Sequence, residues 1–300
     1  MKKYAFLFLI IILAVSGCAT LSKSDLPAQS DIIEFEPQKI DIAYDVMLMR
    51  IDLRRQTTTQ TRTVTTTDSQ GRSSTRTETY EVPVAYHYLG VDLGNGIFLD
   101  ANMNLSLNLF QLLGLGKDQD FTIVKKGRGW FGSDTTFTRT GSRLTIDFGG
   151  LFSSKMEVEL KENNARFKGG ILSNDQEISV ENGRITYDPH GMFEGWGKSY
   201  ITTTGSSASI PGFWKDTAIN KNKDGSINLG DALVVRHEGK KIDFRYAGWF
   251  GTEYVFTMVR TKNRIVYYDN RMNGVMIEFA GDRVKTKSNA GEEEYIVTKK

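Results

Sequence analysis

Hydrophobic and polar residues alternate along most of the chain after residue 40. Short runs rich in Thr, Val, Ile, Tyr and Phe are separated by Gly, Asn and Asp, and a period of two is typical of strands that bury one face. The strands expected from this pattern include Phe121–Lys125, Thr135–Thr140, Leu144–Phe148, Met156–Leu160, Ile178–Val180, Arg184–Tyr187, Ile242–Tyr246, Tyr254–Arg260, Arg264–Tyr268, Val275–Phe279 and Tyr295–Val297. The sequence therefore predicts an all-β protein of antiparallel, hairpin-rich sheets, arranged as a sandwich or an open, barrel-like fold.

The residues between these runs have the chemistry of tight turns. Asn95-Gly96 stands between two apolar runs, and Asn and Gly tolerate the positive φ that a two-residue hairpin turn requires. Glu181-Asn182-Gly183 and Gly281-Asp282 are similar. We expect at most one short helix, within Leu105–Leu113, where four leucines share a helical face. An extended interpretation of that segment fits almost as well.

The first 18 residues form a pattern of a different kind. Lys2 and Lys3 precede an unbroken apolar run from Tyr4 to Val15, which continues into Val15-Ser16-Gly17-Cys18. Twelve apolar residues are too few for a membrane-spanning helix, which needs about 20, and the order of regions is that of a secretory signal. The segment resembles the lipobox signal of bacterial lipoproteins. The resemblance covers residues 1–18 only, and it implies that signal peptide 1–17 is removed and that Cys18 carries lipid, including palmitate.

The same resemblance implies a location. In lipoproteins of enteric bacteria, a residue other than aspartate after the cysteine accompanies transport to the outer membrane, and here that residue is Ala19. Two or three acyl chains hold a protein on a membrane almost permanently. We therefore expect a lipid-anchored protein on the periplasmic face of the outer membrane, with residues 18–40 as a tether. The alternative is an ordinary secretory signal in which Cys18 has no role.

Composition limits the remaining chemistry. Removal of residues 1–17 leaves 283 residues with 36 basic and 36 acidic side chains, so the mature chain is formally neutral and nothing favours nucleic acid as a partner. Cys18 is the single cysteine. Once it is acylated, disulfides, cysteine metal sites and cysteine nucleophiles are excluded.

One tryptophan motif occurs twice. Gly129-Trp130-Phe131-Gly132 returns 119 residues later as Gly248-Trp249-Phe250-Gly251. This echo predicts two related β units, 41–190 and 191–300, with chance recurrence as the alternative. Trp130, Trp249 and also Trp196 could stack on a carbohydrate, because an indole ring offers a flat apolar face. A tight β corner that buries each indole is the competing interpretation.

Residues 220–231 resemble the calcium loop of EF-hand and dockerin modules, with oxygen-bearing side chains at alternating positions and Gly225 at the sixth. The resemblance implies four side-chain ligands and one carbonyl, from Asn220, Asn222, Asp224, Asp231 and Ser226 respectively. Lys221 and Lys223 oppose cation binding. A hairpin loop with Gly225 in the left-handed region is the alternative that we favour, so that Ca²⁺ is at most a weak cofactor and no other cofactor is expected.

A threonine-rich segment at residues 56–79 is polar on both faces. Eight of the twelve residues 56–67 are threonine, and the turn at 68–72 would pair Arg62 with Glu78 and Val64 with Arg76. Such a hairpin cannot lie in a core, so we expect an arm that projects into solvent. Arg62, Arg72 and Arg76 would let it dock on another envelope protein or an acidic glycan. The alternative is a solvent-exposed hairpin that binds no partner.

Catalytic motifs are absent from the sequence. It contains no G-x-S-x-G, H-E-x-x-H or G-x-x-x-x-G-K-[ST] pattern, and its three histidines lie far apart in the chain. We therefore expect a non-catalytic binding or structural module of the bacterial envelope. The alternatives are a surface-exposed adhesin or carbohydrate-binding lipoprotein, and a hydrolase of envelope polysaccharide.

Overall fold

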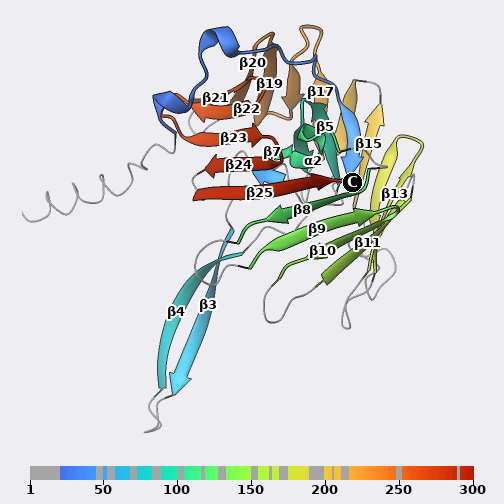
Figure 1. The fold of residues 1–300 in the computed structure, drawn as a ribbon, viewed down its shortest axis with the longest axis vertical. Helices are drawn as coiled ribbons and strands as arrows, with labels where there is room; N and C mark the ends of the chain where they lie inside the picture. The colour runs from blue at the N-terminus through green and yellow to red at the C-terminus, as the bar shows by residue number, and fades with distance from the viewer. Residues whose placement is uncertain are drawn as a thin grey trace, which may run out of the picture.

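Three groups of antiparallel strands make up the fold in a computed structural model (Figure 1). The structure describes residues 21–44, 50–52, 58–67, 73–82, 89–100, 105–115, 119–127, 133–149, 155–161, 164–168, 175–188, 199–204, 206–210, 216–247, 252–288 and 291–300. Within these ranges, 18 strands close into a barrel, five form a second sheet and two form a separate hairpin. The predicted all-β, antiparallel, hairpin-rich fold is confirmed.

The barrel is built almost entirely from neighbours in sequence. Its strands, in chain order, are β8 (Phe121–Lys125), β9 (Thr135–Thr140), β10 (Arg143–Asp147), β11 (Lys155–Lys161), β12 (Asn164–Phe167), β13 (Gln176–Glu181), β14 (Arg184–Asp188), β15 (Ser199–Thr204), β16 (Ser207–Ile210), β17 (Thr217–Lys221), β18 (Ile227–Leu229), β19 (Leu233–Glu238), β20 (Lys241–Ala247), β21 (Glu253–Arg260), β22 (Arg264–Asp269), β23 (Gly274–Ala280), β24 (Arg283–Ser288) and β25 (Gly291–Lys299). Each strand pairs with the next, and β25 returns to pair with β8, which closes the sheet. Closure removes the free edges that an open sheet would expose.

Alternation along each strand separates an apolar inner face from a polar outer face. In β10, Leu144 and Ile146 are fully buried, whereas Arg143 is exposed and Thr145 and Asp147 are partly exposed. The same pattern runs through β24 and β25. Because side chains of successive residues point to opposite faces of a sheet, the hydrophobic residues of the barrel gather in its interior.

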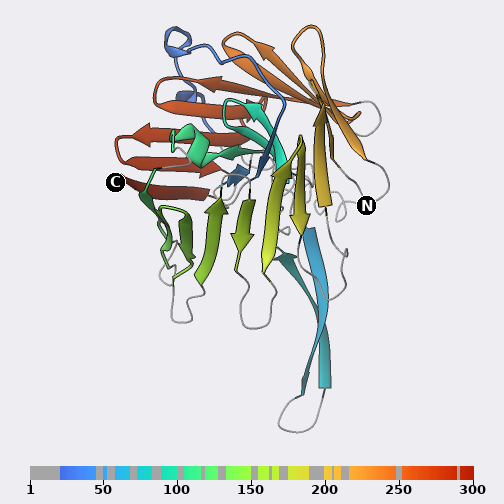
Figure 2. The same cartoon turned by 90° about the vertical axis from the view of Figure 1, so that its right-hand side faces the viewer.

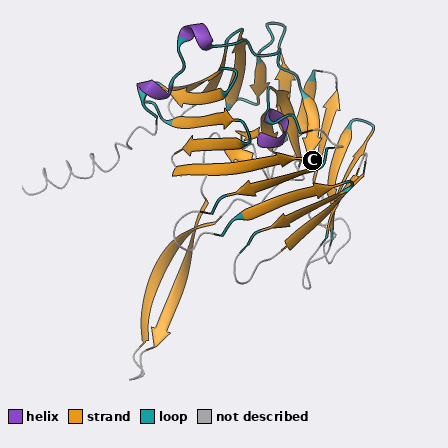
Figure 3. Ribbon diagram, in the orientation of Figure 1, coloured by secondary structure: helices purple, strands orange, loops and turns teal. Residues whose placement is uncertain are grey.

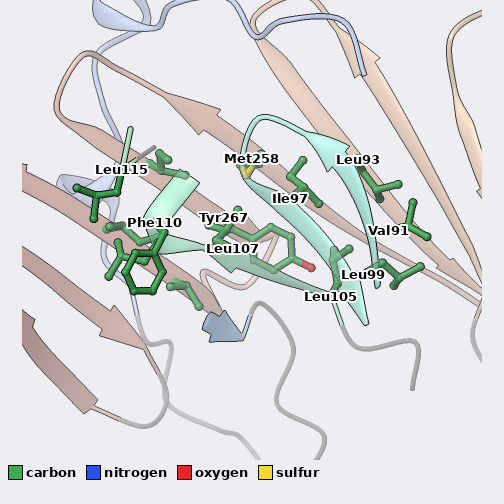
Figure 4. Packing of buried hydrophobic residues seen from close by; sticks show 14 of the residues in the cluster. Val91, Leu93, Ile97, Leu99, Leu105, Leu107, Phe110, Leu115, Met258 and Tyr267 are labelled. Atoms are coloured by element: carbon green, nitrogen blue, oxygen red, sulfur yellow. The ribbon is translucent and has the colours of Figure 1, made fainter. Parts of the chain in front are cut away.

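A second sheet fills that interior. Its order is β1-β5-β6-β7-β2, and its strands are β1 (Asp41–Tyr44), β2 (Arg50–Asp52), β5 (Leu89–Gly94), β6 (Ile97–Asp100) and β7 (Leu105–Asn108). Leucines, isoleucine and valine of β5, β6 and β7 form one continuous cluster with inward residues of the barrel. Figure 4 shows Leu107 of the inner sheet beside Tyr267 of the barrel wall, and Ile97 near Met258. The barrel and its inner sheet therefore share a single core.

The local predictions for this inner sheet are confirmed. Asn95 and Gly96 both have positive φ, 56° and 78°, at the turn between β5 and β6. One short α-helix, α2 (Leu109–Leu112), follows β7, and the Asn108 side chain caps it by accepting a hydrogen bond from the Gln111 backbone N–H at 3.2 Å. Helix is confined to short pieces among the described residues (Figure 3).

The two ends of the barrel differ. At one end the strands are joined by tight turns such as Gly141-Ser142, Asn182-Gly183 and Gly281-Asp282, and we call it the turn end. At the other end, called the loop end, the strand termini such as Lys125 and Thr135 are separated by longer connections. Since neighbouring strands are antiparallel, every connection belongs to one end or the other.

The segment that precedes β1 is packed against the barrel. It contains two 3₁₀ turns, η1 (Lys23–Asp25) and η2 (Gln29–Asp31), and it buries Leu21, Ile32 and Phe35. Its backbone donates hydrogen bonds from Leu21 to Met272, at the loop end, and from Phe35 to Gly239, at the turn end. We call residues 21–40 the strap. The strap differs from the free tether expected from the sequence, because its apolar residues find partners on the outer wall and end of the barrel.

Strands of both predicted β units belong to one barrel. The expected boundary at 190/191 falls between β14 and β15, which pair with each other from Arg184↔Thr202 to Tyr187↔Ser199. Phe137, which follows the first copy of the tryptophan motif, and Phe256, which follows the second, both contribute to the common core. The duplication itself stays a prediction.

Candidate functional site

The calcium-like residues are divided among strand β17, the turn before β18 and the turn after β18. Asn222 and Asp224 lie in the turn between β17 and β18, where Gly225 has the predicted positive φ of 83°. Asp224 accepts hydrogen bonds from the Ser226 hydroxyl at 2.6 Å and the Ser226 backbone N–H at 3.0 Å, and Arg236 lies 3.5 Å away. The hydrogen bonds from Ser226, together with Arg236, hold the pKa of Asp224 below its ordinary value.

The rest of the expected ligand set lies outside this turn. Asn220 lies in β17 and pairs with Asn228, and Asp231 belongs to the next turn, between β18 and β19. The Asn222 amide donates to Ser226 and to Asn228. Within the described ranges, no three His, Cys, Asp or Glu residues are grouped so as to hold a metal ion. The turn is thus closed by its own hydrogen bonds, and weak calcium binding stays a prediction.

The threonine-rich arm is a hairpin of two ten-residue strands, β3 (Thr58–Thr67) and β4 (Ser73–Val82). Its register is the predicted one, with Arg62 opposite Glu78 and Val64 opposite Arg76. Arg72 lies outside the described residues. Figures 1 and 2 show the two strands extending well beyond the barrel, in a sheet of their own.

The arm is attached to the inner sheet. It is inserted between β2 and β5, at the end of the sheet opposite to the Asn95-Gly96 turn. Asn95 exchanges hydrogen bonds with the backbone of Glu36, on the part of the strap that lies at the turn end. The arm therefore leaves the barrel toward the loop end.

The predicted tryptophan platforms fall outside the described residues. This holds for Trp130, Trp196 and Trp249 alike. The strands that flank them in the chain end at the same end of the barrel, because β8, β14 and β20 all finish at the loop end. A role for these indoles in stacking on carbohydrate stays a prediction.

The beginning of the strap is held by a buried cluster and an ion pair. Leu21 packs with Val259 and Val266 on the outer face of β21 and β22. Asp25 accepts hydrogen bonds from the Ser22 backbone N–H at 2.7 Å and from Lys287 at 2.9 Å. Burial acts to raise the pKa of Asp25, but the bonds from Ser22 and Lys287 outweigh it and hold the pKa below the ordinary value of 3.8.

A second polar group on the outer wall was not anticipated from the sequence. Asp243 is buried, with 5% of its surface exposed, and accepts hydrogen bonds from Thr257 at 2.8 Å and Lys241 at 3.3 Å. Lys241 also pairs with Glu238 at 2.9 Å, and these two acidic partners raise its pKa. The ion pair of Lys241 with Glu238 thus joins β20 to β19, and the hydrogen bond from Thr257 to Asp243 joins β21 to β20. The only sequence signal was an acidic residue at an outward position of a strand.

The chain matches no protein-family model, no curated protein and no solved structure. No helix in the described part of the chain is long and apolar enough to cross a bilayer.

Proposed function

We propose that this protein is a lipid-anchored component of the bacterial envelope, on the periplasmic face of the outer membrane, and that its body acts as a non-catalytic binding or structural module. The observation that carries the proposal is the polarity of the barrel. Apolar side chains face inward onto the inner sheet, and charged side chains face outward. A body of this kind stands in water, so its membrane attachment comes from the acyl chains on Cys18.

Ion pairs on the outer wall support a water-facing body. Arg283 pairs with Glu294 at 3.3 Å between β24 and β25, and Lys155 pairs with Asp147 at 3.2 Å between β10 and β11. A barrel that crosses a membrane carries instead an apolar outer band about 25 Å tall, and charges in that band cost about 2–4 kcal/mol each at the bilayer midplane. The outer wall is suited to water, and covalent lipid supplies the anchor.

Because the interior of the barrel is filled with side chains, we expect this protein to bind a partner on its outer surface. Leu99, Leu107 and Phe110 occupy space that would otherwise be a lumen, and each is at most 2% exposed. The arm, in contrast, forms a two-stranded sheet of its own outside the core, and its strands β3 and β4 include Arg62 and Arg76. Partner binding through the arm, to another envelope protein or an acidic glycan, is the activity that this arrangement supports best.

The anchor is tested by Cys18→Ala. Metabolic labelling with palmitate should mark the unaltered protein and leave the variant unlabelled. On fractionation the variant should leave the membrane, while its β circular-dichroism spectrum and its melting temperature are retained, because the proposed anchor is covalent and the described core begins at Leu21. A variant that stays membrane-bound, together with an unaltered protein that takes up no label, would disprove the lipoprotein assignment.

A further inference from the structure

The position of the strap constrains how an anchored barrel can stand on a membrane. Leu21 is 3% exposed, and its backbone N–H donates to the carbonyl oxygen of Met272 at 2.9 Å. Met272 lies in the turn between β22 and β23, at the loop end. Cys18 precedes Leu21 by three residues, which span at most about 11 Å when fully extended. A lipid-bearing Cys18 therefore keeps this turn close to the bilayer.

The strand end beside that turn exposes large apolar side chains. Tyr254 is 56% exposed and Val255 is 38% exposed, at the start of β21. Phe256, the next residue, pairs with Asp269, the last residue of β22, so Tyr254 and Val255 lie level with the β22–β23 turn. Adjacent strands are about 4.8 Å apart. The exposed pair is therefore well within reach of the anchor.

The two exposed residues are consecutive, so they belong to opposite faces of the strand. The first buried residues of β21 are Met258 and Val259, which lie further along the strand on its two faces. The end of β21 thus stands clear of the packed wall. Among the described residues, the charged side chains around it are Arg245 and Glu253, which pair at 3.8 Å, Asp269 at the end of β22, and the exposed Arg271 of the turn.

We propose that the loop end at β21–β23 faces the bilayer, with Tyr254 and Val255 in contact with the lipid interface. This inference rests on the proposed lipid anchor. The tether length brings the surface to the membrane, and the side chains suit it, since tyrosine is enriched at membrane–water interfaces. Arg271 adds attraction to anionic headgroups. The interface contact orients this part of the barrel, with the strand ends of β21–β23 toward the membrane and the Gly239-Lys240 turn between β19 and β20 away from it.

The orientation is measured with single fluorescent labels on the full-length, acylated protein. Cys18 is the only cysteine and is blocked by lipid, so Val255→Cys, or Lys240→Cys at the exposed turn end, introduces the only free thiol. The labelled proteins are reconstituted in vesicles of phosphatidylethanolamine and phosphatidylglycerol that contain a headgroup-level lipid quencher. We expect a blue shift and a loss of emission at position 255, and neither change at position 240.

Two controls accompany this test. Arg271→Cys provides a second label near the anchor, in case substitution at position 255 perturbs folding. Palmitate labelling of each variant separates the two proposals, because an unlabelled protein contradicts the anchor itself. Equal quenching at 240 and at 255 or 271, or no quenching near the anchor of an acylated protein, overturns the proposed orientation while leaving the anchor intact. A label at 255 that is shielded without quenching points to a protein partner on this surface and likewise overturns it.

Discussion

Individual glycines show how tightly the barrel wall is packed. Gly274 begins β23 and pairs with Tyr268. A Cβ added at Gly274 would meet the carbonyl oxygen of Tyr267 and would lie 2.8 Å from the Cα of Tyr268. Gly281, at the turn end, has a positive φ of 64° and no atom within 4 Å of an added Cβ. The two glycines are therefore required for different reasons, one for space and one for backbone conformation.

This difference predicts unequal costs for the same substitution. Gly274→Ala should lower the free energy of unfolding by about 2–4 kcal/mol, because the backbone of β22 must shift to admit a methyl group. Gly281→Ala should cost about 1 kcal/mol, the strain of a left-handed alanine. Urea denaturation of both variants measures the two values. Equal costs would mean that the close approach at Gly274 relaxes freely.

At the scale of elements, the strap is an independent layer on the outer wall. It is fixed by Leu21, Ile32 and Phe35, by the Asp25–Lys287 ion pair, and by Arg260, which donates to the Glu34 carbonyl oxygen at 3.0 Å and lies 5.0 Å from the centre of the Phe35 ring. These contacts join a segment near the N-terminus to strands β19, β21 and β24. The strap is thus held on the barrel from Leu21 onward.

The Asp25–Lys287 pair predicts a pH-dependent contribution to strap attachment. The pKa of Asp25 is depressed in the folded protein, so its stabilisation is complete above the ordinary value of 3.8 and is lost as pH falls through the lower folded value. Asp25→Asn should therefore cost about 1 kcal/mol at pH 7 and progressively less below pH 3.8.

Thermal unfolding and limited proteolysis within residues 21–40 measure this effect. Asp31→Asn is a matched control, because the Asp31 side chain accepts a hydrogen bond only from its neighbour Ser30 among the contacts found, at 3.0 Å. A loss of stability in Asp25→Asn that is the same at every pH would show that the carboxylate charge is not the cause.

The arm is the second independent element. Deletion of Thr57–Thr79, with the ends joined by a short glycine-containing turn, should leave the melting temperature nearly unchanged, because β3 and β4 pair only with each other. Crosslinking in the envelope should at the same time lose a partner adduct. If the deletion unfolds the body, the arm is part of the fold; if every adduct persists, another surface binds the partner.

For the whole molecule, the barrel and the inner sheet form one cooperative unit. Leu107 of the inner sheet is fully buried and belongs to the same hydrophobic cluster as Leu144 and Ile277 of the wall. Neither sheet can bury its apolar face without the other. Loss of packing in the inner sheet is therefore expected to destabilise the entire barrel.

Leu107→Ala tests this coupling. We expect a loss of about 2–5 kcal/mol, typical of a large-to-small change in a core, in a single unfolding transition followed both by far-ultraviolet circular dichroism and by tryptophan fluorescence. Thr145→Ala, at an outward position of β10, should change stability by less than about 0.5 kcal/mol. Two separate transitions in the Leu107 variant would contradict a shared core.

The sequence by itself determined the local structure. Alternation with a period of two predicted Phe121–Lys125 and Thr135–Thr140 with their observed bounds, Asn-Gly pairs predicted turns with positive φ, and the threonine-rich arm could be given its register. These features depend on neighbouring residues and on a hairpin turn, so the chemistry of a short segment is enough to specify them.

Only the tertiary structure decided how those strands combine. Closure of the barrel depends on the pairing of β25 with β8. Ile296 of β25 pairs with Val124 of β8, 172 positions earlier in the chain. The hydrophobic pattern of neither strand indicates this pairing. The strap was mistaken for a tether because Leu21, Ile32 and Phe35 are spaced irregularly and become buried only when the barrel wall is present. Local periodicity reports which face of a strand is apolar, whereas the partner that covers this face is selected by the packing of the whole chain.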